Sequence, residues 1–408
     1  MNLQKSSLNN AMSYKVLVVG QGYVGLPLSL AAAGAGNSVT GYDIDSLLVS
    51  QLNNGICNIN SDYESSLRSA IESGNLNFID VIPGGSYFEI IVICVPTPLD
   101  KNKFPDLSYI NNAIKAISST LNQDCLVIIE STVGTGTVRS MILKALAENS
   151  GMQESKLRIA FSPERIDPHN MSWNVINTPK LISALSPVAL DLAYEFYSTF
   201  INHLVVCDSV EVAETAKLLE NSFRLINISF INEMSIYCEK IGIDIKKVIE
   251  AASSKPFGFM PFFPSLGVGG HCIPVDPIYL SEKAKSIDAP IDMIEKAIQV
   301  NSQLPLYFVR RAEVKINGLK GKNVLVIGVS YKPNIADTRE TPVGPLIKLL
   351  RDKGAQVMWH DKLVKIWNNE KSVEISSNYD LAILATVHDN TDFTELGSVP
   401  ILDTRGST

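Results

Sequence analysis

The sequence lacks an excess of positive charge, paired cysteines and long apolar runs, and each absence excludes a class of protein. The net charge of −7 gives no general attraction for nucleic acid or an anionic membrane, so local groups must hold any phosphate-bearing ligand. The six cysteines show neither a CxxC pair nor regular spacing, which argues against a disulfide framework. The first dozen residues lack the apolar core of a signal peptide, and no window reaches the roughly 20 apolar residues of a membrane span. We therefore expect a cytoplasmic protein that binds neither nucleic acid nor membrane.

With 408 residues, the chain is too long for one hydrophobic core. Through the first 200 or so residues, short apolar runs alternate with segments of helical spacing, a rhythm typical of a parallel, doubly wound sheet. The strands are expected at Val16–Val19, Val39–Tyr42, Ile90–Val95, Leu126–Ile129 and Ile159–Phe161. Helices are expected at Leu26–Ala35, Tyr109–Leu121 and Thr137–Ala147.

The pattern then changes. Val210 to Lys240 contains neither Pro nor Gly and has apolar residues at helical intervals, and helical signals continue to about Lys315 around a Gly/Pro-rich loop at 255–277. So long a helix must bury its apolar stripe against something, either as a spine between domains or at a dimer interface, and we expect at least a homodimer. A second block has predicted strands at Val324–Ile327, Ala355–Trp359, Leu381–Ala385 and Ile401–Leu402 and a helix at Pro345–Lys353.

These patterns predict an α/β protein of three domains. Two Rossmann-like domains with doubly wound parallel sheets are expected at residues 13–207 and 316–408. An all-α domain at 208–315 is expected to join them and to form the dimer contact.

The first predicted strand ends in Gly20-Gln21-Gly22-Tyr23-Val24-Gly25, a dinucleotide-binding turn. In such a turn Gly20 makes the tight bend, Gly22 admits the pyrophosphate and Gly25 lets helix and strand pack, while the helix N-terminus faces the phosphates. Asp43 ends the second strand, where a carboxylate accepts hydrogen bonds from the ribose hydroxyls and repels a 2′-phosphate. The sequence therefore predicts NAD as cofactor rather than NADP. The second block has only Gly328 of this pattern.

A glycine run precedes Cys272 in the loop Gly267–Pro277. Glycine lets a substrate approach a nucleophilic thiol closely, and His271 and Asp276 are candidates for handling protons. We expect His271 to hydrogen-bond the loop backbone rather than to act as a base. A zinc site is not expected, because adjacent residues rarely share a metal and no partner pair is visible. Together with the dinucleotide turn, the thiol indicates oxidation of a carbonyl through a covalent thioester.

Lys217 and Asn221 are four residues apart in the long helix and so share a face. A lysine beside an amide can stabilise an alkoxide or oxyanion during hydride transfer. On spacing alone, Lys217 is better explained as a solvated surface charge.

The chain resembles the nucleotide-sugar dehydrogenase family, NAD-dependent enzymes that oxidise the sixth carbon of a UDP-hexose to a carboxylate. The matching motifs follow the family order across nearly the whole chain. They are Val16–Gly20, Val95–Pro98, Glu130–Val133, Ser162–Arg165, Ala216–Asn221, Gly267–Pro277, Tyr331–Pro333, Asp337–Glu340 and Asp403–Arg405.

The resemblance implies a role for each matched residue. Cys272 would capture the aldehyde as a thiohemiacetal, which a second NAD oxidises to a thioester before hydrolysis. Lys217 and Asn221 would stabilise the oxyanion, Asp276 with Thr132 would orient and activate water, and Glu164 would stand beside the thioester step. Cofactor-binding positions would be Gly20, Gly22, Tyr23, Val24, Gly25, Asp43, Thr97, Thr132 and Arg339. Substrate-binding positions would be Glu164, Arg165, Lys217, Asn221, Gly269, Lys332 and Arg405.

The substrate can be narrowed by the same comparison. The phrase Gly-Gly-His-Cys-Ile-Pro-Val at 269–275 and Ser-Pro-Glu-Arg at 162–165 resemble enzymes of UDP-N-acetylhexosamines, and Ile273-Pro274-Val275 favours UDP-N-acetylglucosamine. UDP-N-acetylmannosamine and UDP-glucose are the alternatives. The sequence departs from the family at Leu48, where a cation is usual, and at Ser265-Leu266, where Gly-Pro is usual.

Two other kinds of protein share some of these features. A β-hydroxyacid dehydrogenase of the phosphogluconate type has a nucleotide domain and a Lys-x-x-x-Asn helix, but Cys272 and the second α/β block argue against it. A non-catalytic NAD or nucleotide-sugar binding protein is supported only by the departures at Leu48 and Ser265-Leu266.

Overall fold

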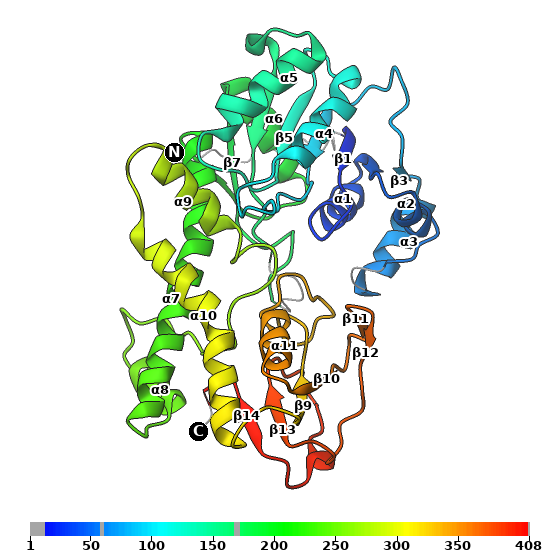
Figure 1. Ribbon diagram of the computed structural model, residues 1–408. Helices are drawn as coiled ribbons and strands as arrows, with labels where there is room; N and C mark the ends of the chain where they lie inside the picture. Colours follow the sequence, from blue (N-terminus) through cyan, green and yellow to red (C-terminus); the bar gives the residue numbers. More distant parts are fainter. Residues whose placement is uncertain (1–12, 58–60, 167–171, 407–408) are drawn as a thin grey trace. The chain divides into compact units, whose positions relative to one another are not determined.

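The computed structural model describes residues 13–57, 61–166 and 172–406 (Figure 1). The chain forms two compact units, which divide between Lys217 and Leu218. This division falls inside the long helix α7 (Val210–Lys240), whose bounds are those predicted from the sequence. Each unit contains its own mainly or wholly parallel sheet and its own hydrophobic cores.

The first unit contains an eight-stranded sheet in the order β3-β2-β1-β4-β5-β6-β7-β8. Its strands are β1 (Lys15–Val19), β2 (Ser38–Tyr42), β3 (Leu76–Ile79), β4 (Ile90–Ile93), β5 (Leu126–Ile129), β6 (Arg158–Phe161), β7 (Lys180–Ala184) and β8 (Leu204–Val206). Its α-helices before α7 are α1 (Gly25–Gly34), α2 (Ser46–Asn53), α3 (Glu64–Glu72), α4 (Ser108–Ile117), α5 (Leu143–Ser150) and α6 (Pro187–Ser198). Short 3₁₀ turns lie at η1 (Ser61–Tyr63), η2 (Ser118–Thr120) and η4 (Glu154–Lys156), and a π-helical turn lies at η3 (Val138–Ile142).

This sheet is buried on both faces. Along β1, Val16 and Val18 pack into a core with residues of α1 and α6, whereas Leu17 and Val19 pack into a second core with residues of α4 and α5. Strands covered on both faces are apolar at every position, as β4 and β5 are. Strands β1, β4 and β5 are parallel neighbours, so their carboxyl ends lie at one edge of the sheet. Ligands bind at this edge in such folds.

The second unit combines helices with a four-stranded parallel sheet in the order β10-β9-β13-β14. Its sheet strands are β9 (Asn323–Ile327), β10 (Gln356–His360), β13 (Leu381–Leu384) and β14 (Ile401–Asp403), and a small hairpin is formed by β11 (Ile366–Trp367) and β12 (Glu370–Lys371). Its helices besides α7 are α8 (Ile245–Ser253), α9 (Asp276–Ser286), α10 (Asp292–Lys315) and α11 (Val343–Asp352), with a 3₁₀ turn at η5 (Thr394–Leu396). Helices α10 and α11 cover one face of the sheet, and residues 373–399 cover the other.

The predicted α/β class with a helical central segment is confirmed, but several local predictions differ from the structure. Strand β7 runs antiparallel to β6, where a wholly parallel sheet was expected; the described residues between them form no helix, and an antiparallel neighbour needs none. Strand β4 ends at Ile93 rather than Val95, although the Cys94 N–H still donates to the Val19 carbonyl at 2.8 Å. The helix predicted at Thr137–Ala147 begins as the π-helical turn and continues to Ser150.

Candidate active site

The turn after β1 has the geometry that its three glycines predict. Gly20 has a φ of 89°, and its N–H donates to the carbonyl of Tyr42 at 2.8 Å. A Cβ at Gly25 would lie 1.8 Å from the Gly20 carbonyl oxygen, so a larger residue cannot start α1 there. A Cβ at Gly22 would meet nothing within 4 Å, so the space above this residue is open to a ligand. Gly20 therefore makes the bend, Gly22 leaves room for a ligand to approach, and Gly25 allows α1 to pack against the turn.

Asp43 follows β2 and faces the same turn. Its Oδ2 accepts the Gln21 N–H at 2.8 Å and its Oδ1 accepts the Asp45 N–H at 3.1 Å, which leaves each oxygen a lone pair for a ribose hydroxyl. Helix α1 begins at Gly25 and has no side-chain N-cap, so the positive end of its dipole is left for a phosphate. Thr97 follows β4, the neighbour of β1, and so lies at the same edge of the sheet. These residues fit a dinucleotide.

Glu164 and Lys217 form a buried pair in the first unit. Lys217 Nζ lies 3.5 Å from Glu164 Oε2, and both residues are at least nine-tenths buried. Burial raises the pKa of Glu164, although the charges of Lys217 and Lys180 oppose the rise. Glu164 Oε1 is buried and has no hydrogen-bond partner among the described residues. The carboxyl group is thus suited to exchanging a proton with a reacting group. The interpretation of Lys217 as a solvated surface charge was wrong, because the residue is buried.

A second buried ion pair lies beside it and was not predicted. Lys180 Nζ, on β7, is 2.9 Å from Glu130 Oε1, and the Tyr197 hydroxyl on α6 donates to the same oxygen. The only sequence signal was the acidic Glu130 directly after the apolar strand β5. Burial and the nearby Glu130 raise the pKa of the Cys94 thiol well above its usual value, so this cysteine is not the reactive one.

A cavity in the first unit joins the dinucleotide turn to these ionic groups. It is lined by Val24, Leu28, Glu130, Arg165, Ile166, Val175, Thr178, Pro179 and Lys180. Two predicted binding residues, Val24 and Arg165, therefore face one space. Arg165 is fixed by donation from Nη1 to the Pro179 carbonyl at 2.8 Å.

Thr132 lies half-buried in the loop after β5, and helix α7 anchors the end of that loop. The Glu214 carboxylate accepts the N–H of Gly136 at 2.5 Å and that of Val138 at 2.9 Å. Burial raises the pKa of Glu214 to about 7, against the lowering effect of these two N–H groups.

In the second unit, Cys272 is exposed at the end of the glycine loop. Its carbonyl accepts the Asp276 N–H at 2.8 Å, so the thiol stands one turn before α9. Asp276 is buried, and its Oδ2 accepts a 2.6 Å hydrogen bond from Asn221 Nδ2. Burial, assisted by the charge of Arg339, lowers the pKa of His271 beside the thiol, so this imidazole is neutral at pH 7.

The glycine loop rests on the segment after β9. A Cβ at Gly269 would lie 2.7 Å from Tyr331 Cβ, and one at Gly270 would lie 2.8 Å from the Tyr331 ring. The Gly270 N–H donates to the Arg339 carbonyl at 3.0 Å. Glycine is therefore required here by close packing on Tyr331, which sequence reasoning did not identify. It is the contact that brings the thiol loop to the segment carrying Lys332.

Two arginines in the second unit share one local motif, Asp-Thr-Arg. Arg339 Nε donates to Asp337 Oδ1 at 2.9 Å, and Arg405 Nε donates to Asp403 Oδ1 at the same distance. Each aspartate also accepts the backbone N–H of its arginine. A guanidinium held this way keeps a fixed direction.

The two departures from the family pattern are accommodated locally. Leu48 packs half-buried against a core of the first unit. Leu266 is buried in the core with α10, and the Ser265 N–H donates to Asn232 Oδ1 at 2.9 Å. The loop before the glycines is thus anchored without the usual Gly-Pro.

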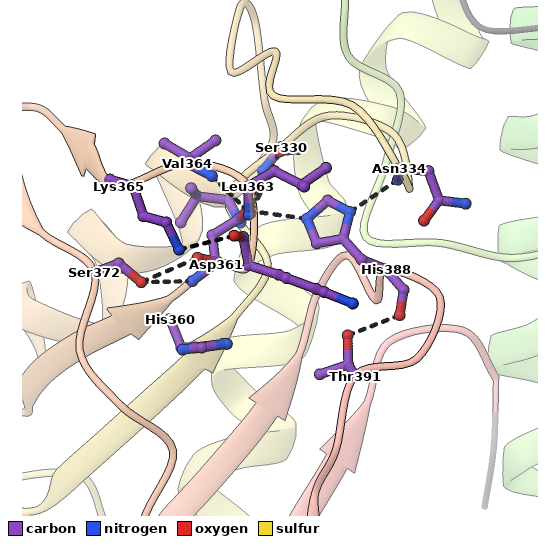
Figure 2. A network of polar contacts seen from close by, with 12 residues as sticks. Ser330, Asn334, His360, Asp361, Leu363, Val364, Lys365, Ser372, His388 and Thr391 are labelled. Carbon is purple, nitrogen blue, oxygen red and sulfur yellow. Dashed lines mark hydrogen bonds and ion pairs between the residues drawn. The ribbon is translucent and has the colours of Figure 1, made fainter.

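The turn after β9 repeats the backbone geometry of the turn after β1. Gly328 has a φ of 88°, and its N–H donates to the His360 carbonyl at 2.8 Å. Asp361 takes the place of Asp43 and accepts the Val329 N–H at 2.8 Å. Unlike Asp43, however, Asp361 is fully buried within a network that includes His388 (Figure 2). This acid cannot accept from a ribose, so the second turn is not a second dinucleotide site.

The predicted catalytic residues thus divide between the two units. Thr132, Glu164 and Lys217 lie in the first, and Asn221, Cys272 and Asp276 lie in the second. Across the described residues, no group of three or more His, Cys, Asp or Glu side chains is arranged to hold a metal ion. Within the same part of the chain, none of the helices combines the length and apolar character needed to span a bilayer.

Comparison with known proteins gives three matches in chain order to the UDP-glucose/GDP-mannose dehydrogenase family. Residues 14–201 match its NAD binding domain, 211–303 its central domain and 325–407 its UDP binding domain. A UDP-N-acetyl-D-mannosamine dehydrogenase from Methanocaldococcus jannaschii is 32% identical over 93% of this chain and 87% of its own. A UDP-N-acetyl-D-glucosamine 6-dehydrogenase from Pseudomonas aeruginosa is 34% identical over 94% and 92%. The solved structure of a UDP-D-ManNAc dehydrogenase from Pyrococcus horikoshii superposes with a TM-score of 0.87 and 29% identity over 96% and 95%.

Proposed function

This chain belongs to the UDP-glucose/GDP-mannose dehydrogenase family and is an NAD-dependent UDP-sugar dehydrogenase, and on that premise we propose its substrate and mechanism. The substrate is a UDP-N-acetylhexosamine, with UDP-N-acetylglucosamine favoured, and the product is the uronic acid used in polysaccharide precursor synthesis. One alcohol, one water and two NAD give one carboxylate, two NADH and three protons. The observation that carries the proposal is the exposed Cys272 one turn before the buried Asp276, which Asn221 holds.

The thiol keeps the half-oxidised sugar attached between two oxidations. The Cys272 sulfur bonds to C6 of the aldehyde that the first oxidation forms. A hydride then leaves the same carbon to give a thioester, and water cleaves the carbon–sulfur bond and returns the thiol. Bound NAD supplies the hydride acceptor. The covalent bond prevents the reactive aldehyde from escaping.

The polar residues around this chemistry have separate tasks. Lys217 and Asn221 donate to the oxyanion that develops on C6. Asp276 and Thr132 orient the attacking water. Glu164, whose pKa burial raises, holds or releases a proton beside the thioester.

The same residues that fit a dinucleotide are proposed to hold NAD. Gly22 leaves its backbone open to the pyrophosphate, the N-terminus of α1 faces the phosphates, and Asp43 accepts from the ribose hydroxyls. Arg339 is proposed to bind the cofactor as well. Lys332 and Arg405 are proposed to bind the UDP-sugar.

The preference for an N-acetylated sugar rests on two supports. The loop sequence around His271 resembles that of enzymes acting on such sugars. The M. jannaschii and P. aeruginosa relatives are, by name, dehydrogenases of two UDP-N-acetylhexosamine epimers. UDP-N-acetylmannosamine and UDP-glucose are the alternatives that the assay below separates.

We also propose that the enzyme is a homodimer or a higher homo-oligomer in the cytoplasm. Four large apolar side chains lie exposed along one side of α7, at Leu219, Phe223, Phe230 and Tyr237. Their spacing of four and seven residues puts them on a single face, and an exposed apolar stripe of this kind is typical of an interface. A reducing compartment suits an enzyme whose nucleophile is a thiol.

The test is the number of NADH formed per sugar. Purified protein is incubated with NAD and limiting UDP-N-acetylglucosamine, UDP-N-acetylmannosamine or UDP-glucose, and the NADH absorbance is read at completion. Two NADH per UDP-N-acetylglucosamine, with a higher kcat/KM than the other sugars, is the expected result. One NADH indicates a hydroxyacid-type dehydrogenase and none with any sugar indicates a binding protein, and either result refutes the proposal.

A further inference from the structure

Three neighbouring strands of the second sheet end beside one another, and a polar residue follows two of them. Asp361 follows β10, and His388 lies shortly after β13, while β9 between these strands ends at Gly328. A Cβ at Gly328 would lie 1.6 Å from the Thr386 carbonyl oxygen, so the turn after β9 presses on the chain that leads to His388. Figure 2 shows the hydrogen bonds that join these segments.

The hydrogen bonds of His388 define its tautomer. Its Nδ1 receives the Asn334 backbone N–H at 2.8 Å and therefore carries no proton. Its Nε2 consequently carries the proton and donates it to Asp361 Oδ1 at 3.0 Å. The two residues are only 4% and 1% exposed, so solvent cannot replace either bond.

The segment from Val329 to Asn334 is thus held at both ends. At its start, Asp361 Oδ2 accepts the N–H groups of Val329 and Ser330 at 2.8 and 3.3 Å. At its end, His388 accepts the N–H of Asn334, and the Asn334 side chain exchanges two hydrogen bonds with the exposed Asp389. Asn334 has a φ of 64°, a left-handed conformation that needs such support.

The segment Val329–Asn334 includes two residues that link the second sheet to the proposed active site. Tyr331 packs under Gly269 and Gly270 of the thiol loop. Lys332 is the proposed UDP-sugar ligand. A shift of this segment would move a substrate-binding cation and the support of the thiol loop together.

We propose that His388 is a positioning residue for the nucleotide-sugar. By accepting the Asn334 N–H at Nδ1, it fixes the segment Val329–Asn334 in the conformation that binds the uridine diphosphate group. This inference rests on the proposed function, because the ligand of Lys332 comes from it. It goes further in assigning substrate affinity to a buried residue that does not itself touch the substrate.

Two substitutions of similar shape separate the roles of the two ring nitrogens of His388. His388→Asn places an amide oxygen near the position of Nδ1, so it keeps an acceptor for Asn334 but loses the donor to Asp361. His388→Gln places an amide N–H near the position of Nε2, so it keeps the donor but loses the acceptor. The Kd values for UDP and for NAD are measured on the full chain by titration calorimetry. His203→Gln, at an exposed histidine, is the matched control.

We expect His388→Gln to weaken UDP binding about 10-fold, because the Asn334 N–H is left buried without an acceptor. His388→Asn and His203→Gln should stay within about twofold of the native protein, and NAD binding should be unchanged in all three. Asp389→Ala removes the exposed partner of the Asn334 side chain, and should weaken UDP binding about threefold even if the His388 variants fold poorly.

Several results would overturn the inference. Equal losses of UDP affinity in His388→Asn and His388→Gln would show that Nδ1 has no special role. A parallel loss of NAD affinity would show general damage instead of positioning. If the native chain does not bind UDP, the proposed function fails. Amide hydrogen exchange then tests separately whether His388 holds the Asn334 N–H. Faster exchange of Asn334 in His388→Gln than in His388→Asn supports it, and equal exchange refutes it.

Discussion

The carboxyl group of Glu214 should make the stability of the first unit depend on pH. This glutamate is fully buried in α7. It accepts the N–H of Gly136, in the loop that follows Thr132, and the N–H of Val138, at the start of η3. Burial raises its pKa from 4.5 to about 7. The folded state therefore binds this proton more tightly than the unfolded state. The contribution to stability is full below pH 4.5 and is lost as the pH rises through about 7.

The size of the effect follows from the two pKa values. The difference between 4.5 and about 7, at about 1.4 kcal/mol per pH unit, gives about 3 kcal/mol. Most of this loss should occur between about pH 5 and about pH 8. Glu214→Gln has no titrating proton, so its stability relative to the native chain should rise by about that amount over the same interval.

The measurement is the free energy of unfolding in urea, followed by circular dichroism at several pH values in this interval. Glu148→Gln is the control, because Glu148 is an exposed glutamate in the neighbouring helix α5. It should follow the native pH profile. If Glu214→Gln and the native chain show the same pH dependence, the argument that Glu214 is neutral near pH 6 is refuted.

Three further predictions concern the cofactor, the nucleophile and the assembly. Native protein should prefer NAD to NADP. Asp43→Ala should lower the ratio of kcat/KM for NAD to kcat/KM for NADP about 10-fold, since it removes a charged acceptor for the ribose. Equal use of both cofactors by the native chain would contradict this. Cys272→Ala should lower acid formation by more than about a thousand-fold while calorimetry shows unchanged NAD binding, whereas two NADH per sugar in that variant would exclude the thioester route. Light scattering should give at least twice the 44.5 kDa of one chain, and Phe230→Asp should shift the mass toward the monomer; a native monomer would refute the dimer.

Features encoded within a few consecutive residues could be predicted from the sequence. The glycine turn after β1 depends on backbone conformations that only glycine adopts readily, so Gly20 and Gly25 indicated it directly. Helix α7 was bounded correctly because a long segment without Pro or Gly has a clear helical period. The strands β3, β7 and β8 were missed, since each is short or lies next to polar residues that break the pattern.

Features that depend on distant partners could not be predicted. His388 meets Asp361 across 27 residues and Asn334 across 54, and no local pattern records either contact. The same holds for Lys217, whose burial depends on Glu164 in another element. The turn after β9 lacks the second and third glycines of the dinucleotide pattern, yet its backbone conformation needs only Gly328. What distinguishes it from the first turn is the burial of Asp361, which is a tertiary property.

The buried ion pair of Glu130 and Lys180 constrains how this enzyme can change over evolutionary time. Loss of either partner leaves a charge in the interior, at a cost of about 3–5 kcal/mol, a large part of the stability of an ordinary domain. Tyr197 adds a third member, because its hydroxyl donates to the same carboxylate. Substitutions at these positions should therefore be epistatic: each is tolerated only after a compensating change at another. A chimera that exchanges β5, β7 or α6 with a relative must transfer all three residues together.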